Sequence, residues 1–392
     1  MFGESMKKKL KILPLILALV LLVCSCSKSV PAVKVNSDEW KTNYTFVFCH
    51  GLSGWGSYDK QNKYLQYWGM RTGDLLEYLN EQGYNCVSAS VAPHGSAWDR
   101  ACELYAQLSG SIVDYGKEHS ERCKHARYGA DYSSNPLIDK WDSENKINLL
   151  GHSFGGATVR LMCELMANGS KAETDATDPD DISPLFTGGK ADYIYSITAL
   201  ASPHNGTTAY DIDPEEEAGS SYQNWLSGIM ANANNPEEDG RAYYDHANYD
   251  MFIDNALELN SQIETLDNVY YFSVPCNSSI RQEDGTYLPD EDKTEAMFCR
   301  SSILMGKLTE TTPNGFEVDE TWFMNDGLVN TVSALAPFGA PQKEYEEGKV
   351  ERGIWNIMPI YDGDHMSLQG GFTIKNDVKE FYLTHLDMIN KL

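Results

Sequence analysis

Basic residues are scarce in this sequence. Its 392 residues include 31 Lys and Arg against 57 Asp and Glu, which gives a formal net charge of −26. Proteins that bind nucleic acids neutralise phosphates with Lys and Arg, so this balance argues against DNA and RNA as partners. An acidic surface is also not drawn to anionic membranes.

A recognisable cysteine framework is absent as well. The chain has no C-x-x-C spacing, and beyond Cys24 and Cys26 an odd number of cysteines is spread along it: Cys49, Cys86, Cys102, Cys123, Cys163, Cys276 and Cys299. This pattern excludes a disulfide scaffold and a cysteine zinc site. Several of them lie on apolar runs and are expected to be small buried side chains. A pair between Cys276 and Cys299 across a loop remains open.

The apolar run near the amino terminus is too short to span a bilayer comfortably. Lys7–Lys9 precede an almost uninterrupted apolar stretch from Leu10 to Val23, and Val23-Cys24-Ser25-Cys26 resembles a bacterial lipobox. We expect a signal peptide over residues 1–25, lipidation of Cys26, and a tether over 26–40 that anchors the protein at the cell surface. The alternative is a plain secretory signal that releases the protein.

Hydrophobic residues make up 42% of the chain, enough for one large core in a domain over residues 41–392. No internal repeats are visible. Periodicity predicts strands at residues 45–49, 84–91, 147–150, 194–200, 269–274 and 354–361, and helices at 75–82, 100–112 and 378–389. Strands that alternate with helices indicate the α/β class, with a mainly parallel sheet covered on both faces.

The segment Gly151-His152-Ser153-Phe154-Gly155 carries the strongest chemical signal. It follows a short apolar run and leads directly into helical periodicity that Asn168-Gly169 closes. Strand, sharp turn and helix are the context that a nucleophile elbow requires, because its glycines let the backbone crowd around a strained serine. The pattern predicts Ser153 as a nucleophile.

A nucleophilic serine needs an imidazole to take its proton and a carboxylate to orient that imidazole. In this fold class the chain order is Ser, acid, His, and of the histidines His365 and His385 lie late enough. His385 belongs to an apolar helical stripe and is expected to be structural. His365 follows a predicted strand in a polar loop, so we expect it to be the base.

Several segments around these residues together resemble a known family. They run in order from about Thr45 to about Leu383: residues 46–56 (FVFCHGLSGWG), 98–103 (WDRACE), 183–186 (SPLF), 202–208 (SPHNGTT) and 325–331 (NDGLVNT). This set resembles the zinc-containing lipases of the thermophilic bacillus and staphylococcal type. The resemblance implies an α/β-hydrolase fold with a zinc-site insertion at about 95–135 and a lid at about 208–245.

The resemblance also assigns the remaining active-site roles. Asp326 matches the acid in the family's Asn-Asp-Gly motif, while Asp362 and Asp364 are too close in sequence to His365 to orient it. The backbone N–H groups of Leu52 and Phe154 are expected to form the oxyanion hole. Family members commonly carry other side chains there, which changes the shape of the pocket but leaves the donors in place.

By the same resemblance, the zinc ligands fall on Asp99, His119, His125 and Asp245. Two imidazoles and two carboxylates suit tetrahedral zinc in a structural role. His246 is a rival to Asp245. Asp99 and His119 are too far apart for one continuous helix to bring them together. We therefore expect the chain to break and return, at Gly110 or Gly116.

Two features depart from the thermophilic relatives. Their calcium ligands include a glutamate and an Asp-Pro pair after the catalytic histidine, where this chain has Ser367 and Gln369-Gly370-Gly371-Phe372. Calcium prefers several oxygen ligands including carboxylates, so no tight site is expected near His365. The lid is also shorter and more polar than theirs, which predicts a weaker dependence on a lipid interface.

These observations favour a serine ester hydrolase, first of all a triacylglycerol lipase that acts through an acyl-enzyme on Ser153. A carboxylesterase or polyester hydrolase with weak interfacial activation is the second candidate. A surface lipoprotein that binds ligands without catalysis is the third, and the complete set of Ser153, Asp326 and His365 argues against it. The sequence does not indicate an oligomeric state.

Overall fold

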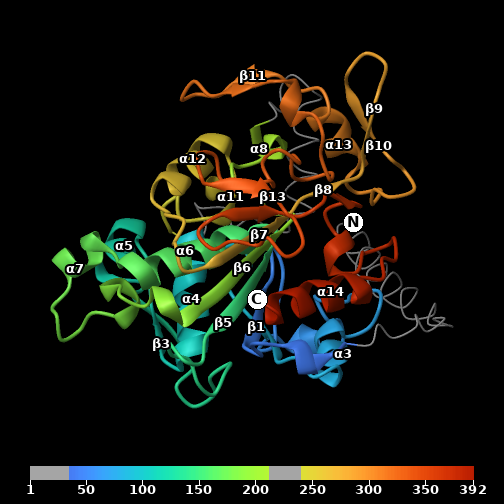
Figure 1. Cartoon of the computed structure of the whole chain (residues 1–392). Coiled ribbons are helices and arrows are strands. Elements are labelled where there is room, and N and C mark those ends of the chain that lie inside the picture. Colours follow the sequence, from blue (N-terminus) through green and yellow to red (C-terminus); the bar gives the residue numbers. More distant parts are fainter. Residues whose placement is uncertain (1–34, 212–239) are drawn as a thin grey trace, which may run out of the picture. The chain divides into compact units, whose positions relative to one another are not determined.

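A parallel β-sheet organises the chain (Figure 1). The computed structural model describes residues 35–211 and 240–392, and the elements below belong to the unit Ser37–Leu392. In these residues the main sheet has seven strands in the order β13-β14-β7-β6-β5-β1-β2, and every neighbouring pair is parallel. Its strands are β1 (Thr45–Cys49), β2 (Cys86–Ala89), β5 (Ile147–His152), β6 (Ile194–Leu200), β7 (Tyr270–Val274), β13 (Gln342–Glu344) and β14 (Trp355–Ile357).

Helices and small two-stranded sheets surround it. The helices are α3 (Leu75–Glu81), α4 (Ala97–Ser109), α5 (Lys117–Cys123), α6 (Gly155–Asn168), α7 (Lys171–Ala176), α8 (Thr208–Asp211), α11 (Ala247–Asp250), α12 (Ile253–Ser261), α13 (Cys299–Met305) and α14 (Lys379–Asn390). The small sheets pair β3 (Ile112–Asp114) with β4 (Tyr128–Asp131), β8 (Cys276–Asn277) with β15 (Tyr361–Asp362), β9 (Ser279–Arg281) with β10 (Tyr287–Pro289), and β11 (Glu310–Thr311) with β12 (Glu317–Val318).

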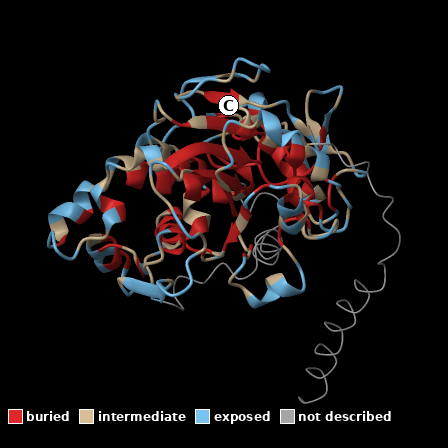
Figure 2. Cartoon of the chain, turned by 60° about the horizontal axis from the view of Figure 1, so that its bottom comes forward, coloured by how far each residue is buried: buried red, intermediate tan, exposed pale blue. Residues whose placement is uncertain are grey.

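Alternation along the central strands gives the sheet two apolar faces. Val47, Leu149 and Ile197 belong to the large cluster of buried side chains that also includes residues of α4 and α6. Phe48, on the other face, contacts Tyr382 of α14. The strands are therefore buried on both sides, as Figure 2 shows in red, and continuous apolar runs are what such strands require.

The sequence predicts most central elements, with errors at their ends. The strand expected at residues 354–361 is wrong in extent: β14 ends at Ile357, and β15 pairs with β8 in a separate sheet. Pro359 lies between them and has no N–H to donate to a sheet. The helix expected at 100–112 begins earlier, where Ser96 caps it, and ends before Gly110, which adopts the left-handed conformation with φ 65°.

Two segments that the sequence singles out lie wholly or mostly outside the described residues. The predicted signal peptide and Cys26 lie outside the described residues, and so does most of the predicted lid, residues 212–239. Among the residues it does describe, no helix combines the length and apolar character needed to cross a membrane. All seven cysteines from Cys49 to Cys299 have free thiols, so Cys276 and Cys299 do not pair.

Candidate functional site

Ser153 lies in the sharp turn between β5 and α6. Its φ of 55° is in the left-handed region, where a serine is strained. The flanking glycines are needed because the backbone passes so close: a Cβ on Gly155 would lie 2.5 Å from the carbonyl oxygen of Cys49. A Cβ on Gly51 would lie 2.7 Å from that of Ser153. The turn therefore places the Ser153 hydroxyl at the carboxyl end of the sheet, beside the loop that follows β1.

His365 and Asp326 complete a hydrogen-bonded chain that begins at Ser153. The Nε2 atom of His365 lies 2.8 Å from the Ser153 Oγ, and its Nδ1 lies 2.9 Å from the Asp326 Oδ2. All three residues are buried. They come from three loops at the same end of the sheet, in the order serine, acid, histidine along the chain. The structure thus brings together the three residues that the sequence singles out.

The Asp326 carboxylate is held from two sides. Its Oδ1 accepts hydrogen bonds from the backbone N–H groups of Leu328 (3.0 Å) and Val329 (2.7 Å), which leaves Oδ2 for His365. Gly327, with φ 96°, makes the tight turn that aims those donors. The backbone N–H of His365 also donates to the Asp326 carbonyl oxygen at 2.9 Å. Backbone and side-chain hydrogen bonds therefore both hold Asp326 against His365.

The two acids next to His365 in sequence have other partners. The Asp364 carboxylate accepts hydrogen bonds from Ser367 Oγ (3.0 Å) and from the backbone N–H groups of Glu295 and Met366. Burial raises the pKa of Asp364 to about 6. The Asp362 carboxylate lies at the surface beside Lys293, 2.7 Å from its Nζ. Neither contacts the imidazole of His365 in the described structure.

A buried network that the sequence does not reveal connects the loop of His365 to the loop that follows β1. The His152 Nε2 lies 2.8 Å from the His365 carbonyl oxygen, so this nitrogen carries the proton. The Tyr67 hydroxyl then donates to the His152 Nδ1 at 2.7 Å and accepts from the Gly51 N–H at 3.0 Å. Burial lowers the pKa of His152 to about 3, which keeps it neutral. His152 therefore positions the loop of His365.

The backbone N–H groups of Leu52 and Phe154 are free to bind an oxyanion. In the described part of the chain, neither has a hydrogen-bond partner. Arg100 fixes the loop before Leu52, because its Nη2 donates to the His50 carbonyl oxygen at 2.5 Å. Phe154 is the N-cap residue of α6, which begins at Gly155, so its N–H has no partner within the helix.

A mostly apolar cavity of about 130 Å³ opens above Ser153. Ser153, His152 and His365 line it together with apolar side chains from several loops: Leu52, Trp55, Met70, Tyr210, Met251, Met297, Phe298, Leu328, Val329 and Met366. Apolar walls of this kind fit an acyl chain, and the methionines adapt to its shape. Residues 212–239, between α8 and Gly240, are outside the description of this cavity.

His385 is structural, as its position on an apolar stripe predicts. It is buried between α14 and the sheet, where its Nε2 lies 2.9 Å from the Thr198 Oγ1 and its ring contacts Phe272. Burial lowers its pKa to about 4, below its unfolded value of about 6.5. The neutral ring therefore contributes stability at neutral pH that is lost as the pH falls from about 6.5 towards 4.

This shift gives a testable pH dependence. Between pH 7 and pH 5 the wild-type protein should lose about 2 kcal/mol of unfolding free energy relative to His385→Leu, because only the wild type must also keep His385 unprotonated. Urea unfolding of both proteins at the two pH values measures this difference. A difference between the two proteins that does not change with pH would contradict the assignment.

A second polar cluster joins α4, α5 and the segment before α11. The His119 Nε2 lies 3.1 Å from the Asp99 Oδ1 and 3.4 Å from the Asp245 Oδ1. The His125 Nε2 lies 3.7 Å from the Asp99 Oδ1 and 3.4 Å from the Asp245 Oδ2. The four residues named by the resemblance therefore converge on one point. His125 Nε2 and Asp245 Oδ2 have no hydrogen-bond partner within the described structure.

The chain reaches this arrangement by breaking twice after α4. Gly110 ends α4, and Gly116, with φ 92°, begins the turn into α5, so both expected break points are used. The ring of Trp98 stacks on His119 with centroids 5.1 Å apart, and the cluster is thereby shielded on one side. His246 is not among the grouped donors, which favours Asp245.

Two members of this cluster, Cys123 and Arg241, are not indicated by the sequence. The Cys123 Sγ lies 3.8 Å from the Nδ1 of His119. A second group of side chains that could hold a metal ion therefore contains Cys123 in place of Asp99. The Asp99 and Asp245 carboxylates both lie beside the other ring nitrogen of His119, Nε2. We therefore favour the group that contains Asp99. Arg241 donates to the Asp99 Oδ2 at 2.8 Å and offsets part of the negative charge.

The sheet order, the serine elbow and the hydrogen-bonded serine, histidine and aspartate define the α/β-hydrolase fold. The family described as "Lipase-like, C-terminal domain" matches residues 42–241 and 238–390, which is nearly the whole described chain. The protein belongs to this family.

Named relatives agree with this assignment. Lipase 2 of Staphylococcus aureus is 33% identical over 375 residues, which cover 88% of this chain and 53% of that protein. The chain spans about half the length of the curated relatives it matches. The structure of EstA from Clostridium botulinum is 31% identical with a TM-score of 0.78, covering 94% of this chain and 92% of that one. Staphylococcus hyicus lipase is 26% identical with a TM-score of 0.76, and the match covers 93% of this chain and 99% of that one.

Proposed function

We propose that this protein is a serine hydrolase of carboxylic esters and that its substrates are acylglycerols. The observation that carries the proposal is the continuous chain of hydrogen bonds from Ser153 through His365 to Asp326, at the floor of an apolar cavity. The named lipases and the esterase among its relatives support the same chemistry.

The geometry supplies each step of acyl transfer. His365 Nε2 accepts the proton of the Ser153 hydroxyl as its oxygen attacks the ester carbonyl, and Asp326 holds the Nδ1 proton and stabilises the imidazolium. The N–H groups of Leu52 and Phe154 bind the oxyanion that forms. His365 then returns its proton to the departing alcohol. In the second half, His365 activates a water molecule that cleaves the acyl-enzyme and releases the carboxylic acid and free Ser153.

The size of the cavity favours a second candidate within the same chemistry. The part of it that described residues line has a volume of about 130 Å³, below the usual range for small-molecule sites, about 300–1,000 Å³. A carboxylesterase that prefers short acyl chains fits this volume better than a lipase for long chains. Both candidates use the same three catalytic residues and differ only in the length of chain that the walls accept.

A chain-length series separates the two candidates. We expect kcat/KM for p-nitrophenyl esters to be highest for short acyl chains such as butyrate and to fall towards palmitate, because the walls formed by Phe298 and Leu328 limit the acyl group. Ser153→Ala gives the background rate. An increase in kcat/KM up to palmitate would favour the long-chain lipase, and no serine-dependent rate with any ester would refute the proposal as a whole.

We further propose that the cluster of Asp99, His119, His125 and Asp245 holds a structural zinc ion. Zinc binds nitrogen and oxygen ligands at about 2.0–2.1 Å, which places tetrahedral ligands about 3.3 Å apart. The four separations of 3.1–3.7 Å fit that value. His125 Nε2 and Asp245 Oδ2 are buried and make no hydrogen bond in the described structure, although Arg241 lies 3.5 Å from Asp245 Oδ2, and this supports a metal ion as their partner. A zinc ion here would tie α5 to α4 and leave the chemistry to Ser153.

Removing the metal should destabilise the fold. At about 100–1,000 times Kd, a ligand that binds only the native state contributes about 3–4 kcal/mol, so chelation should lower the Tm by several degrees. Zinc should restore the Tm. Calcium should not raise it through a second site near His365, because the Glu295 and Asp364 carboxylates there already accept backbone N–H bonds.

Elemental analysis of matched variants tests the ligands. His119→Ala with His125→Ala should lose the stoichiometric zinc, whereas His94→Ala, a histidine outside the cluster, should keep about one ion per chain. If the double variant retained the metal, or the wild type grown with ample zinc contained none, the site would be excluded.

The amino-terminal pattern supports the proposal that the enzyme acts from a membrane anchor. Lys7–Lys9, the apolar stretch up to Val23 and Cys26 fit a lipoprotein signal, with lipidation of the Cys26 thiol. Incorporation of labelled fatty acid into the wild type but not into Cys26→Ala tests it. Equal labelling of both would point to Cys24, and labelling of neither to a secreted protein.

A further inference from the structure

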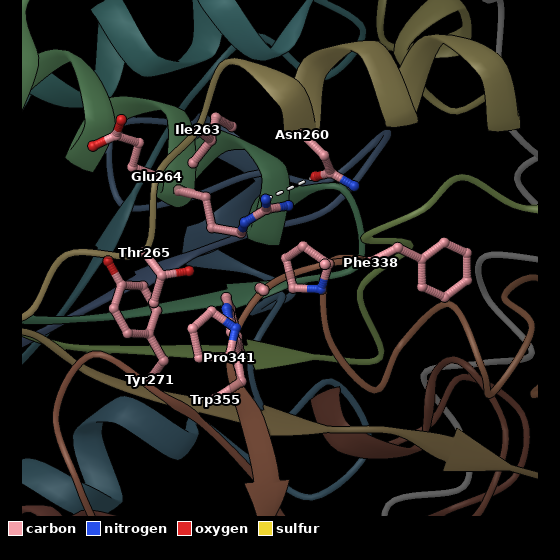
Figure 3. A pocket seen from close by; sticks show the side chains of 12 residues that line it. Asn260, Ile263, Glu264, Thr265, Tyr271, Phe338, Pro341 and Trp355 are labelled. Atoms are coloured by element: carbon pink, nitrogen blue, oxygen red, sulfur yellow. Dashed lines mark hydrogen bonds between the residues drawn. The ribbon is translucent and has the colours of Figure 1, made fainter.

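A second cavity lies beside the helix that follows the nucleophile. Its volume is about 380 Å³, and none of its lining residues also lines the cavity above Ser153. Figure 3 shows its walls: Asn260 comes from α12, Tyr271 and Trp355 come from the strands β7 and β14, and Phe338 from a loop. The cavity therefore sits at the β14 side of the sheet, on the face that α6 covers.

Arg160 of α6 lines this cavity and is 3% exposed. Its guanidinium donates to the Asn260 Oδ1 at 2.7 Å, and its other terminal nitrogen lies 3.4 Å from the His204 Nδ1. In the described part of the chain both of these side-chain partners are neutral, and Arg160 forms no ion pair with a carboxylate. A buried charge without a counter-ion is costly, because desolvation is not offset by an opposite charge.

Two other arginines, Arg127 and Arg100, have their charge neutralised or their donors occupied. Arg127 pairs with Asp114 and Asp181 at 2.8 and 2.7 Å. Arg100, also buried, donates to the carbonyl oxygens of His50 and Ala92 and to a threonine hydroxyl. Arg160 has two of its five N–H donors engaged by neutral groups. Its unused donors and its full charge remain available to the cavity.

The neighbours hold Arg160 in this position. The Asn260 Nδ2 donates to the His204 carbonyl oxygen at 2.7 Å and to the Asn205 Oδ1 at 3.1 Å, so the Asn260 oxygen must face Arg160. Burial holds the pKa of His204 well below its usual range, so this ring stays neutral. The Arg160 Cζ lies 6.0 Å from the ring centroid of Trp355. The site is thus built before any ligand arrives.

The charge and the walls select the class of ligand. One guanidinium balances one negative charge, and its planar fork matches a carboxylate. Trp355 and Tyr271 are buried in the wall behind the cavity, and Phe338, which is 38% exposed, offers aromatic surface to a small apolar body. Glu264, exposed at the rim, and the net charge of −26 disfavour anions with several charges, such as phosphate.

We propose that the Arg160 cavity is a binding site for a small monocarboxylate with a flat or short apolar body, separate from the catalytic site. The carboxylate pairs with the Arg160 guanidinium, and the apolar body lies against the exposed ring of Phe338. The site is connected to the catalytic loops through Asn205, whose Nδ2 donates to the Ser333 and Ala336 carbonyl oxygens beyond Asp326.

Titration calorimetry with sodium benzoate tests the proposal, with neutral benzamide and inorganic phosphate as comparison ligands. We expect wild-type protein to bind benzoate with a Kd of about 1 mM or lower, and to bind the other two at least tenfold more weakly. Arg160→Met should weaken benzoate at least tenfold. Glu264→Gln should strengthen it, because the rim loses a negative charge.

Two further variants keep the test decisive if Arg160→Met does not fold. Ala340→Leu fills the cavity from its surface loop and should abolish binding with Arg160 intact. Leu328→Trp narrows the catalytic cavity and should leave binding unchanged. The proposal is overturned if wild-type protein does not bind benzoate, if phosphate or benzamide binds as tightly, or if binding is lost in Leu328→Trp but survives in Ala340→Leu.

Discussion

Ser153→Ala is expected to lose ester hydrolysis by about 10⁴-fold or more in kcat, with the fold intact. Alanine has no oxygen to attack the ester and form an acyl-enzyme, so only binding and the oxyanion donors would remain. The substitution removes one hydroxyl from a pre-formed turn in which Gly51, Gly151 and Gly155 already provide the space. The circular dichroism spectrum and the melting temperature should therefore stay close to those of the wild type.

Ser202→Ala is the matched control for this experiment. Ser202 is buried beside the same elbow, and its hydroxyl donates to the Gly151 carbonyl oxygen at 3.2 Å, but it has no contact with His365 in the described structure. We expect its kcat to stay within about tenfold of the wild type. Retention of a tenth of the wild-type rate by Ser153→Ala would exclude Ser153 as the nucleophile.

The elbow and the central strands are predictable because their signals are local. A buried parallel strand is a short continuous apolar run, and the glycines on each side of Ser153 stand within one short motif, although the contact that requires Gly155 comes from β1. Boundaries set by one residue are harder to see. Gly110 ends α4 and Pro359 separates β14 from β15, yet periodicity alone carries the helix and the strand past both residues.

The parts of the site that sequence misses depend on contacts between distant residues. Tyr67 joins the Gly51 loop to His152 across 85 residues, and no spacing indicates that a tyrosine will fill this place. Arg241 and Cys123 likewise reach the polar cluster only in the folded chain, and no spacing in the sequence indicates either of them. His152 was within the motif, but its role depends on the position of the His365 carbonyl oxygen, which only the folded chain gives.

The assignment of the acid leads to the second large effect. Asp326→Asn should lower kcat by about 10⁴-fold while the substrate KM changes little. An asparagine keeps the size of the side chain and an oxygen that accepts from the Leu328 and Val329 N–H groups. Its amide nitrogen, however, would then face His365 Nδ1 and favour the tautomer with the proton on Nε2, which cannot accept a proton from Ser153.

Asp364→Asn provides the contrast, because Asp364 adjoins His365 in sequence and is equally buried. Its carboxylate accepts bonds from Ser367 and from two backbone N–H groups, so its loss should lower the Tm more than it lowers kcat. Tautomer disruption and loop disruption thus leave different signatures: a large fall in kcat with a stable fold for Asp326→Asn, and a lower Tm with kcat within about tenfold for Asp364→Asn. If the two variants exchanged these signatures, the carboxylate that orients His365 would be Asp364, and the 2.9 Å contact with Asp326 would be structural.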